Sequence, residues 1–251
     1  MSVQNSTKTN YYKNLLIIDI ETVSSKGAYE ELSLEEQQLW TTKAAQLYKH
    51  TIELPTPNQS YQEKAGIYAE FGKIVCIGLG IFDELDQNLH LRLKHISHTD
   101  EHFLLQEFVR LVLKQEQQGN VHFCGHNIKE FDLPYICRRL IINNIPIPPS
   151  LQLAGTKPWN NPHIDTLELW RFGDYKHYIS LNLLAHILDI PSPKTDINGS
   201  EVGRVYYTEK NLERIANYCL QDIHTTALVY LKLTGAANRA VIPIFVAPKQ
   251  D

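Results

Sequence analysis

The chain has 251 residues, of which 43% are hydrophobic and 21% are charged, and its formal net charge is −4 at pH 7. This composition excludes wholesale disorder, and the acidic charge argues against a protein that coats nucleic acid passively, because such proteins are normally basic. A metal-dependent nuclease stays open, since divalent cations can neutralise a cluster of acids that would otherwise repel phosphate.

Cysteine usage and hydropathy favour a cytoplasmic protein without membrane contact. The four cysteines lie far apart in sequence and form no Cys-x-x-Cys motif. This spacing argues against the common structural zinc sites and favours a reducing compartment. Residues 1–14 lack the apolar core of a signal peptide, and no run approaches the roughly 20 apolar residues that span a bilayer.

One domain is predicted, because no repeat, low-complexity tract or Pro/Gly/Ser-rich linker divides the sequence. We expect a flexible N-terminus over 1–14, a folded domain over 15–235 and an irregular tail over 236–251. A polar excursion at about 24–70 should contain a helix that begins at the capping box Ser33-Leu34-Glu35-Glu36. In the tail, the apolar residues 241–246 either dock as a strand against the sheet or contact a partner.

The predicted elements follow one another in an order typical of an α/β protein. Apolar runs or alternation predict strands at 15–18, 73–82, 89–93, 121–125 and 163–165, with a hairpin turn at 83–88. Helical spacing predicts helices at 33–48, 100–117, 133–142, 180–188 and 208–233, the last ending near Gly235. This order predicts an α/β sheet with an antiparallel start and a parallel continuation, flanked by helices.

The first acidic segment is Asp19-Ile20-Glu21, directly after the apolar run 15–18. Residues two apart in a strand point to the same face, about 6.5–7 Å apart at the backbone. Two carboxylates placed in this way can reach a pair of metal ions about 3.5–4 Å apart. The alternative is a strand end that turns into solvent, where acids are common.

The second and third segments carry Asp132 and the pair Tyr218 and Asp222. Asp132 falls at the start of a predicted helix, where an N-cap role is the alternative to metal binding. Tyr218 and Asp222 are four residues apart and therefore share one helix face, the inward one that also carries Ile215. An aspartate on that face needs a partner such as a metal ion. The alternative is a rim aspartate that hydrogen-bonds a loop.

Three motifs occur along the chain in this order: Asp19-x-Glu21, Asn127-x-x-x-Phe131-Asp132 and Tyr218-x-x-x-Asp222. In these motifs and their order the sequence resembles the DEDD superfamily of 3′–5′ exonucleases, which have a ribonuclease H-like fold. The tyrosine four residues before the last aspartate is typical of the DEDDy branch, and Asn217 stands where the DEDDh branch carries histidine. The stretches 194–202 and 215–219 narrow the resemblance to the predicted exonuclease family related to the proofreading domain of family B DNA polymerases. The similarity extends over about 15–233.

The resemblance implies roles for particular residues. Two divalent ions, Mg²⁺ or Mn²⁺, would be held by the four acids. Asp19 would bridge both ions, Glu21 and Asp222 would complete the site of the attacking water, and Asp132 would hold the second ion. Tyr218 would hydrogen-bond that water, because a phenol with a pKa near 10 is a poor base at neutral pH. Asn127 and Phe131 would position the terminal nucleotide.

The expected substrate is the 3′ end of single-stranded nucleic acid, with nucleoside 5′-monophosphates as products. DNA is favoured over RNA by family analogy, a setting in DNA repair is part of the same expectation, and protein partners are not predicted. Basic residues spread around the expected cleft could contact phosphates: Lys129, Arg138, Arg139, Arg171, Lys176 and Lys194. Trp170, Phe172, Tyr175 and Tyr178 interleave with this charge as in surfaces that stack unpaired bases. A solvated loop with core aromatics is the alternative.

Two other classes of function are weighed against an exonuclease. One is a non-catalytic nucleic-acid-binding module of the same fold, and the other is a structural Ca²⁺-binding protein, against which the lack of EF-hand spacing counts.

Further polar residues have two readings each. Asp165 either adds a fifth acid or caps the turn that follows it. The pairs His98 with His102 and His122 with His126 have metal-like spacing, but ordinary hydrogen-bonded histidines are favoured.

Overall fold

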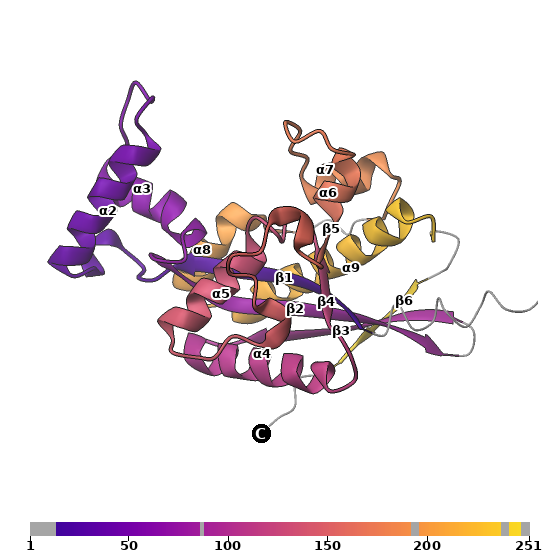
Figure 1. Cartoon of the computed structure of the whole chain (residues 1–251). Coiled ribbons are helices and arrows are strands. Elements are labelled where there is room, and N and C mark those ends of the chain that lie inside the picture. The colour runs from indigo at the N-terminus through magenta and orange to yellow at the C-terminus, as the bar shows by residue number, and fades with distance from the viewer. Residues whose placement is uncertain (1–13, 86–87, 192–195, 237–240, 247–251) are drawn as a thin grey trace, which may run out of the picture.

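A six-stranded mixed sheet forms the centre of the protein (Figure 1), a computed structural model that describes residues 14–85, 88–191, 196–236 and 241–246. The strand order is β5-β4-β1-β2-β3-β6. The strands are β1 (Leu15–Ser24), β2 (Gly72–Leu85), β3 (Asn88–Ser97), β4 (His122–Gly125), β5 (Ile164–Asp165) and β6 (Val241–Phe245). β1, β2 and β3 are antiparallel neighbours, whereas β4, β5 and β6 join the sheet in parallel. This confirms the expected α/β mixed sheet with an antiparallel start and a parallel continuation.

Helices cover both faces of the sheet. The main helices are α4 (Glu101–Glu116) and α5 (Asp132–Ile142) on one face, and α9 (Leu212–Leu233) on the other, with α6 (Thr166–Arg171) and α7 (Leu181–Ile187) packed against α9. Short turns of helix connect them: η3 (Pro149–Leu151), η4 (Pro158–Asn160), η5 (Gly199–Glu201), α8 (Val202–Arg204) and the π-helical turn η6 (Val205–Glu209). Within the described residues, no helix is both long and apolar enough to cross a membrane.

The polar excursion folds into a small helical unit with a core of its own. It contains η1 (Tyr29–Glu31), α2 (Leu34–Leu47), α3 (Pro57–Lys64) and η2 (Ala65–Ile67). The predicted capping box is confirmed, because the Ser33 hydroxyl accepts the Glu36 N–H and the Glu36 carboxylate accepts the Ser33 N–H. Trp40 is fully buried between Tyr61 and Phe71, at ring-centroid distances of 5.4 and 5.0 Å.

Two glycines in β2 bring α9 close to the sheet. A Cβ atom on Gly78 would lie 2.7 Å from the Cys219 sulfur, and one on Gly80 would lie 2.8 Å from Cγ2 of Ile223. Both distances are shorter than real carbon contacts, so any side chain here would push α9 outward. The glycines therefore set the distance between α9 and the strands beside it.

Several predicted boundaries differ from the observed ones. β1 runs on to Ser24, so Asp19 and Glu21 lie inside the strand and not at its end. β2 and β3 extend into the predicted turn 83–88, of which 86–87 lie outside the described residues. α9 begins at Leu212 and not at 208, because the π-helical turn before it ends at Lys210 in a left-handed conformation, with φ 53°.

The ends of the chain bear on two further predictions. The expectation of an irregular tail over 236–251 is wrong at residues 241–245, which form β6 and pair with β3, so the docking-strand interpretation is correct there. Backbone hydrogen bonds offered by the edge of β3 explain this pairing. The predicted flexible N-terminus lies outside the described residues, except for Asn14.

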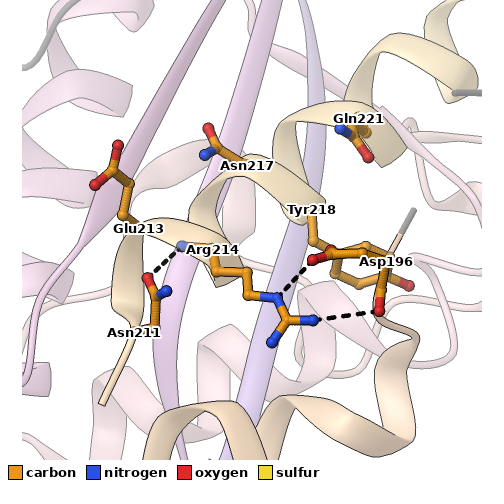
Figure 2. A pocket seen from close by; sticks show the side chains of 7 residues that line it. All are labelled: Asp196, Asn211, Glu213, Arg214, Asn217, Tyr218 and Gln221. Atoms are coloured by element: carbon orange, nitrogen blue, oxygen red, sulfur yellow. Dashed lines mark hydrogen bonds and ion pairs between the residues drawn. The ribbon is translucent and has the colours of Figure 1, made fainter. Parts of the chain in front are cut away.

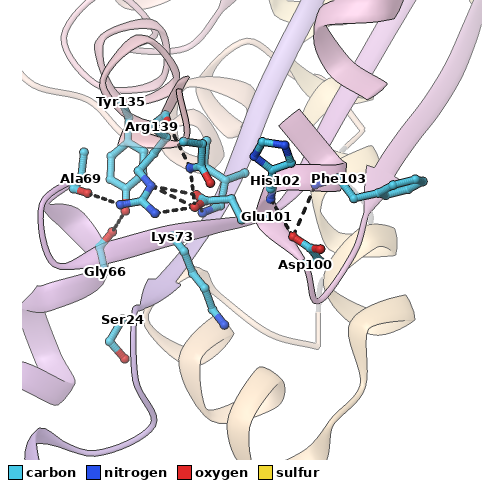
Figure 3. A network of polar contacts seen from close by, with 12 residues as sticks. Ser24, Gly66, Ala69, Lys73, Asp100, Glu101, His102, Phe103, Tyr135 and Arg139 are labelled. Carbon is cyan, nitrogen blue, oxygen red and sulfur yellow. Dashed lines mark hydrogen bonds and ion pairs between the residues drawn. The ribbon is translucent and has the colours of Figure 1, made fainter. Parts of the chain in front are cut away.

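A buried ion pair fastens α4 and α5 to β2 (Figure 3). The Glu101 carboxylate accepts the Ile74 N–H at 2.7 Å and forms a bidentate pair with the Arg139 guanidinium, which also donates to the Ala69 carbonyl at 2.7 Å. The side chains of Glu101 and Arg139 are only 7% and 12% exposed. Arg139 is therefore a structural residue, and the expectation that it contacts phosphate is wrong.

Removing one partner of this pair should destabilise the fold strongly. We predict that Glu101→Gln lowers the free energy of unfolding by about 3–5 kcal/mol, because the Arg139 charge stays buried without its carboxylate. Urea denaturation monitored by circular dichroism measures the change. The matched control is Glu107→Gln, which breaks an exposed pair with Arg110 on the same helix and should cost less than about 1 kcal/mol. Equal losses in the two variants would contradict the prediction.

Candidate active site

Asp19 and Glu21 present their carboxylates on the face of β1 that α9 covers. Asp19 lies opposite Gly78 and Glu21 opposite Cys76 in the antiparallel pair with β2. The thiol of Cys219, on α9, contacts the Asp19 carboxylate at 3.4 Å. Glu21 is only 6% exposed. The two acids therefore lie between the centre of the sheet and the helix that carries the third motif.

The Asp132 side chain binds β1 at the edge of the strand that faces β4. β4 pairs with β1 only along 15–17 and then ends, so the Ile20 N–H has no strand partner on that side. The Asp132 carboxylate accepts this N–H at 3.1 Å. Asp132 is the first residue of α5, whose N-cap is Phe131, so the N-cap interpretation is wrong. The side chain joins α5 to β1 directly between Asp19 and Glu21.

Tyr218 and Asp222 complete the cluster from α9. They lie four residues apart on the helix, and the charge of Asp222 is the largest single influence of a neighbouring acid on the pKa of Tyr218. Both side chains are half-buried. Three segments therefore bring four carboxylates and one phenol together, although the first and the last of them lie about two hundred positions apart in the sequence.

The charges of the four carboxylates are unfavourable to one another in the absence of cations. Burial raises the pKa of each of them, to about 7 for Asp132 and about 6 for Asp222. For Asp19 and Glu21 the pKa is raised well above the usual range, by burial first and then by the neighbouring carboxylates. Burial, and next the charge of Asp222, raises the pKa of Tyr218, so its phenol is neutral at physiological pH.

The donor set fits a hard divalent cation. Ligand atoms of Asp19, Glu21 and Cys219 lie within 4.8 Å of one another, the one such group found among the described residues. Burial raises the pKa of the Cys219 thiol, so the sulfur remains a protonated donor to Asp19 and is a poor ligand. Carboxylate oxygens are left as the ligands, and they suit Mg²⁺ or Mn²⁺ better than zinc.

Comparison with known proteins identifies the family. The family described as predicted 3′–5′ exonucleases related to the exonuclease domain of PolB matches residues 67–240. The chain belongs to this exonuclease family. Among solved structures, the RNase domain of the yeast Pop2 protein is similar, with 14% identity and a TM-score of 0.39 over 91% of this chain and 79% of that chain. Among curated proteins, none matches the sequence.

The family match contains two of the three acidic motifs. It begins at residue 67 and therefore includes Asp132 and Asp222 but not the first motif. The structure joins Asp19 and Glu21 to the matched region, because β1 is inserted between β2 and β4. Most of the excursion at 24–70 also lies outside the matched residues.

Unlike the acids, the residues expected to bind substrate lie in surroundings that differ from one residue to the next. Asn127 follows β4 in a left-handed conformation with φ 63°, and Phe131 is half-buried against the Tyr135 ring at 5.4 Å. Lys129 pairs with Glu168 at 2.7 Å. The charges on this side of the exonuclease domain are therefore partly neutralised within the chain.

The basic and aromatic loop after α6 is mostly exposed. The Arg171 side chain is only 9% exposed and bonds Glu130 and the His177 carbonyl, whereas Lys176 is exposed. Three rings, those of Phe172, Tyr175 and Tyr178, are 67–89% exposed. Trp170 is half-buried and packs against the buried cluster under α7, so it alone of these four rings fits the alternative interpretation. Lys194 lies outside the described residues.

The histidine pairs are hydrogen-bonded residues. His98 and His102 bond to the Asp100 backbone and to Gln106, and the rings of His122 and His126 bond to separate carbonyls, those of Pro162 and Ile179. This agrees with the favoured interpretation. Asp165 is buried and caps α6 by accepting the Leu167 N–H at 2.9 Å.

A polar recess of about 370 Å³ runs along α9 beside Tyr218 (Figure 2). The Arg214 guanidinium on its wall is held by Asp196 at 2.8 Å and by Glu209 at 2.5 Å. The amide side chains of Asn217 and Gln221 line the rest of the wall near Tyr218. Among the described residues of its wall, the recess is therefore polar and has no cation that is free of an acidic partner.

Sequence analysis missed the contribution of Cys219 and Gly78 to this site. Cys219 donates to Asp19, and the missing side chain of Gly78 leaves room for the sulfur. A glycine inside an apolar strand is a signal of close backbone approach. It says nothing about which helix approaches, so the contact could not be inferred from the sequence.

The raised pKa values predict a pH-dependent cost of the metal-free site. The Asp132 carboxyl is protonated more readily in the folded chain than in the unfolded one, so its contribution opposes folding as pH rises from about 4 to about 7. We predict that Asp132→Asn, which keeps an oxygen acceptor for the Ile20 N–H, raises the Tm of metal-free protein at pH 8 by a few degrees and leaves it nearly unchanged at pH 4. Calorimetry with chelator measures both, and a lower Tm at pH 8 would contradict the prediction.

Proposed function

We propose that this protein is a metal-dependent exonuclease that removes nucleoside 5′-monophosphates from the 3′ end of single-stranded nucleic acid. The observation that carries the proposal is the proximity of Asp19, Glu21, Asp132 and Asp222, whose charges influence one another and two of which are buried. Membership of the exonuclease family supports nuclease activity. DNA is favoured as the substrate because the family is related to the exonuclease domain of PolB.

The four carboxylates would hold two Mg²⁺ or Mn²⁺ ions. When bound, such ions lower the pKa of a coordinated water and stabilise the charge that develops on the departing 3′ oxygen. The carboxylates supply the charge that makes this binding favourable. Because β1 and α5 are joined through the Ile20 N–H, Asp132 is already held near Asp19 before any ion arrives.

Tyr218 would orient the attacking water. Its phenol is neutral at physiological pH, because burial and the charge of Asp222 raise its pKa. A neutral phenol can donate and accept hydrogen bonds but does not remove a proton at an appreciable rate.

The strand would approach along the segments that carry the expected binding residues. Asn127 and Phe131 would position the terminal nucleotide. Lys176 is exposed and free to meet a phosphate, whereas Lys129 and Arg171 would have to exchange their present carboxylate partners. The exposed rings of Phe172, Tyr175 and Tyr178 suit stacking with unpaired bases, which supports a single-stranded substrate.

A cytoplasmic location completes the proposal. All four cysteines are free thiols in the structure, three of them buried. Unpaired cysteines are usual in a reducing compartment.

Loss of one acid should abolish degradation. We predict that Asp19→Ala and Asp222→Ala each lower kcat by at least about 1,000-fold, because a missing ligand removes several kcal/mol of transition-state stabilisation. Shortening of a 5′-labelled oligonucleotide in Mn²⁺ measures the rate. The matched control is Asp83→Ala, which removes an acid paired with Arg92 toward the far end of β2 and should leave the rate unchanged. A wild-type protein that binds the strand but never shortens it would be a binding module and not an enzyme.

Tyr218 should affect the rate without affecting the metal. We predict that Tyr218→Phe lowers kcat by roughly 10- to 100-fold, since it removes one oriented hydrogen bond. The Kd for Mn²⁺, measured by calorimetric titration, should stay nearly unchanged because all four carboxylate ligands remain. A large loss of Mn²⁺ affinity would refute the assigned role.

A further inference from the structure

Asp165 holds the turn that leads into Asp132. It lies at the end of β5, opposite Gly125 at the end of β4, and is only 3% exposed. Its two carboxylate oxygens accept three backbone N–H groups from two segments. Oδ1 accepts from Asn127 at 2.8 Å and from Leu167 at 2.9 Å, and Oδ2 accepts from Lys129 at 3.1 Å.

The backbone conformation of this turn is demanding. Asn127 has a φ of 63°, in the left-handed region that side chains other than glycine adopt at a cost. A Cβ atom on Gly125 would lie 2.0 Å from Cγ2 of Ile128, so the turn folds back tightly onto the end of β4. Such a conformation persists only where the surrounding contacts hold it. The Asp165 carboxylate supplies those contacts at Asn127 and Lys129.

A continuous set of hydrogen bonds connects this turn with the acidic cluster. The Phe131 N–H donates to the Asn127 carbonyl at 3.1 Å, and the Leu133 N–H donates to the Ile128 carbonyl at 3.0 Å. These bonds close the turn and place Asp132 at the start of α5. Asp132 in turn accepts the Ile20 N–H, between Asp19 and Glu21. A shift at Asp165 would therefore be transmitted to the cluster.

The Asn127 side chain is also left in an unusual state. Its Oδ1 atom is buried and has no hydrogen-bond partner in the described part of the chain. A buried acceptor without a partner costs free energy, about 1–3 kcal/mol. Asp165 binds the main chain of Asn127 and so fixes where this unsatisfied oxygen lies.

We propose that Asp165 is a positioning residue for the exonuclease reaction, and this inference rests on the proposed function. It acts through the backbone of residues 127–129, on which the placement of Asn127 and Asp132 depends. It is not a metal ligand, because backbone N–H groups already occupy both of its oxygens. The carboxylate is needed because an asparagine has one acceptor oxygen and would place its NH₂ group against one of the N–H donors.

Two substitutions separate positioning from helix capping. Asp165→Asn keeps one acceptor and loses the other. Asp165→Ser keeps an acceptor for the Leu167 N–H, as N-cap serines do, but is too short to bridge to Asn127 and Lys129. The matched control is Asp100→Asn, since Asp100 caps a different helix, α4, by accepting the His102 and Phe103 N–H groups (Figure 3).

The expected result is a loss of function in protein that remains folded. Both Asp165 variants should have kcat/KM on a single-stranded oligonucleotide lowered by about 10- to 100-fold, and Mn²⁺ bound several-fold more weakly, as for residues that orient metal ligands. Asp100→Asn should match wild type in both measurements, with a Tm lowered by no more than the Asp165 variants. Calorimetric titration with Mn²⁺ gives a readout that does not depend on turnover.

The outcomes distinguish this inference from the proposed function. If the folded Asp165 variants had the same kcat/KM and Mn²⁺ affinity as the wild type, the positioning role would be overturned. Unfolding of both variants at room temperature would also overturn it and would assign Asp165 to stability alone. A wild-type protein that binds Mn²⁺ but degrades no oligonucleotide would refute the proposed function. The positioning role of Asp165 would then be tested by the Mn²⁺ affinity of its variants alone. Wild-type protein that binds no Mn²⁺ would overturn both.

Discussion

The repulsion among four neighbouring carboxylates, two buried and two half-buried, is the constraint to which the rest of the structure responds. Burial raises the pKa of every one of these acids, and the charges of neighbouring members of the cluster raise it further at Asp19 and Glu21, so the negative forms are costly together until cations arrive. A chain that relaxed freely would separate them. The strands and helices around the cluster must therefore keep the acids together against their own electrostatics, and the folded core supplies the free energy that this requires.

The fold meets this constraint with a few local devices. β4 stops short of the middle of β1, which frees the Ile20 N–H for Asp132. Gly78 and Gly80 let α9 approach until the Cys219 thiol reaches the Asp19 carboxylate. On the opposite face, the buried pair of Glu101 and Arg139 fixes α4 and α5 to the start of β2. Each device removes a degree of freedom from one of the segments that carry the acids.

Much of this architecture could be read from the sequence, because it depends on local patterns. The capping box at Ser33 predicts where α2 begins, since a cap is satisfied within four residues. Predictions failed where a distant partner decides the outcome. Residues 241–245 become a strand only because β3 offers an edge. The Asp132 side chain bonds away from its own helix because Ile20, 112 positions away, offers an unpaired N–H. The burial of Arg139 also depends on a distant partner, because no neighbouring residue in the sequence indicates that it will pair with Glu101.

The sequence by itself determined the α/β order of elements, the three acidic motifs and the family to which they point, because periodicity and spacing are properties of neighbouring residues. The tertiary structure decided how those motifs meet. It showed that Asp19 and Glu21 lie inside a strand and not at its end, and that Cys219 borders them. It also showed that three of the six expected cationic contacts, Lys129, Arg139 and Arg171, already have acidic partners. These facts depend on which segments pack together, and packing is set by the whole core at once and not by any stretch of chain alone.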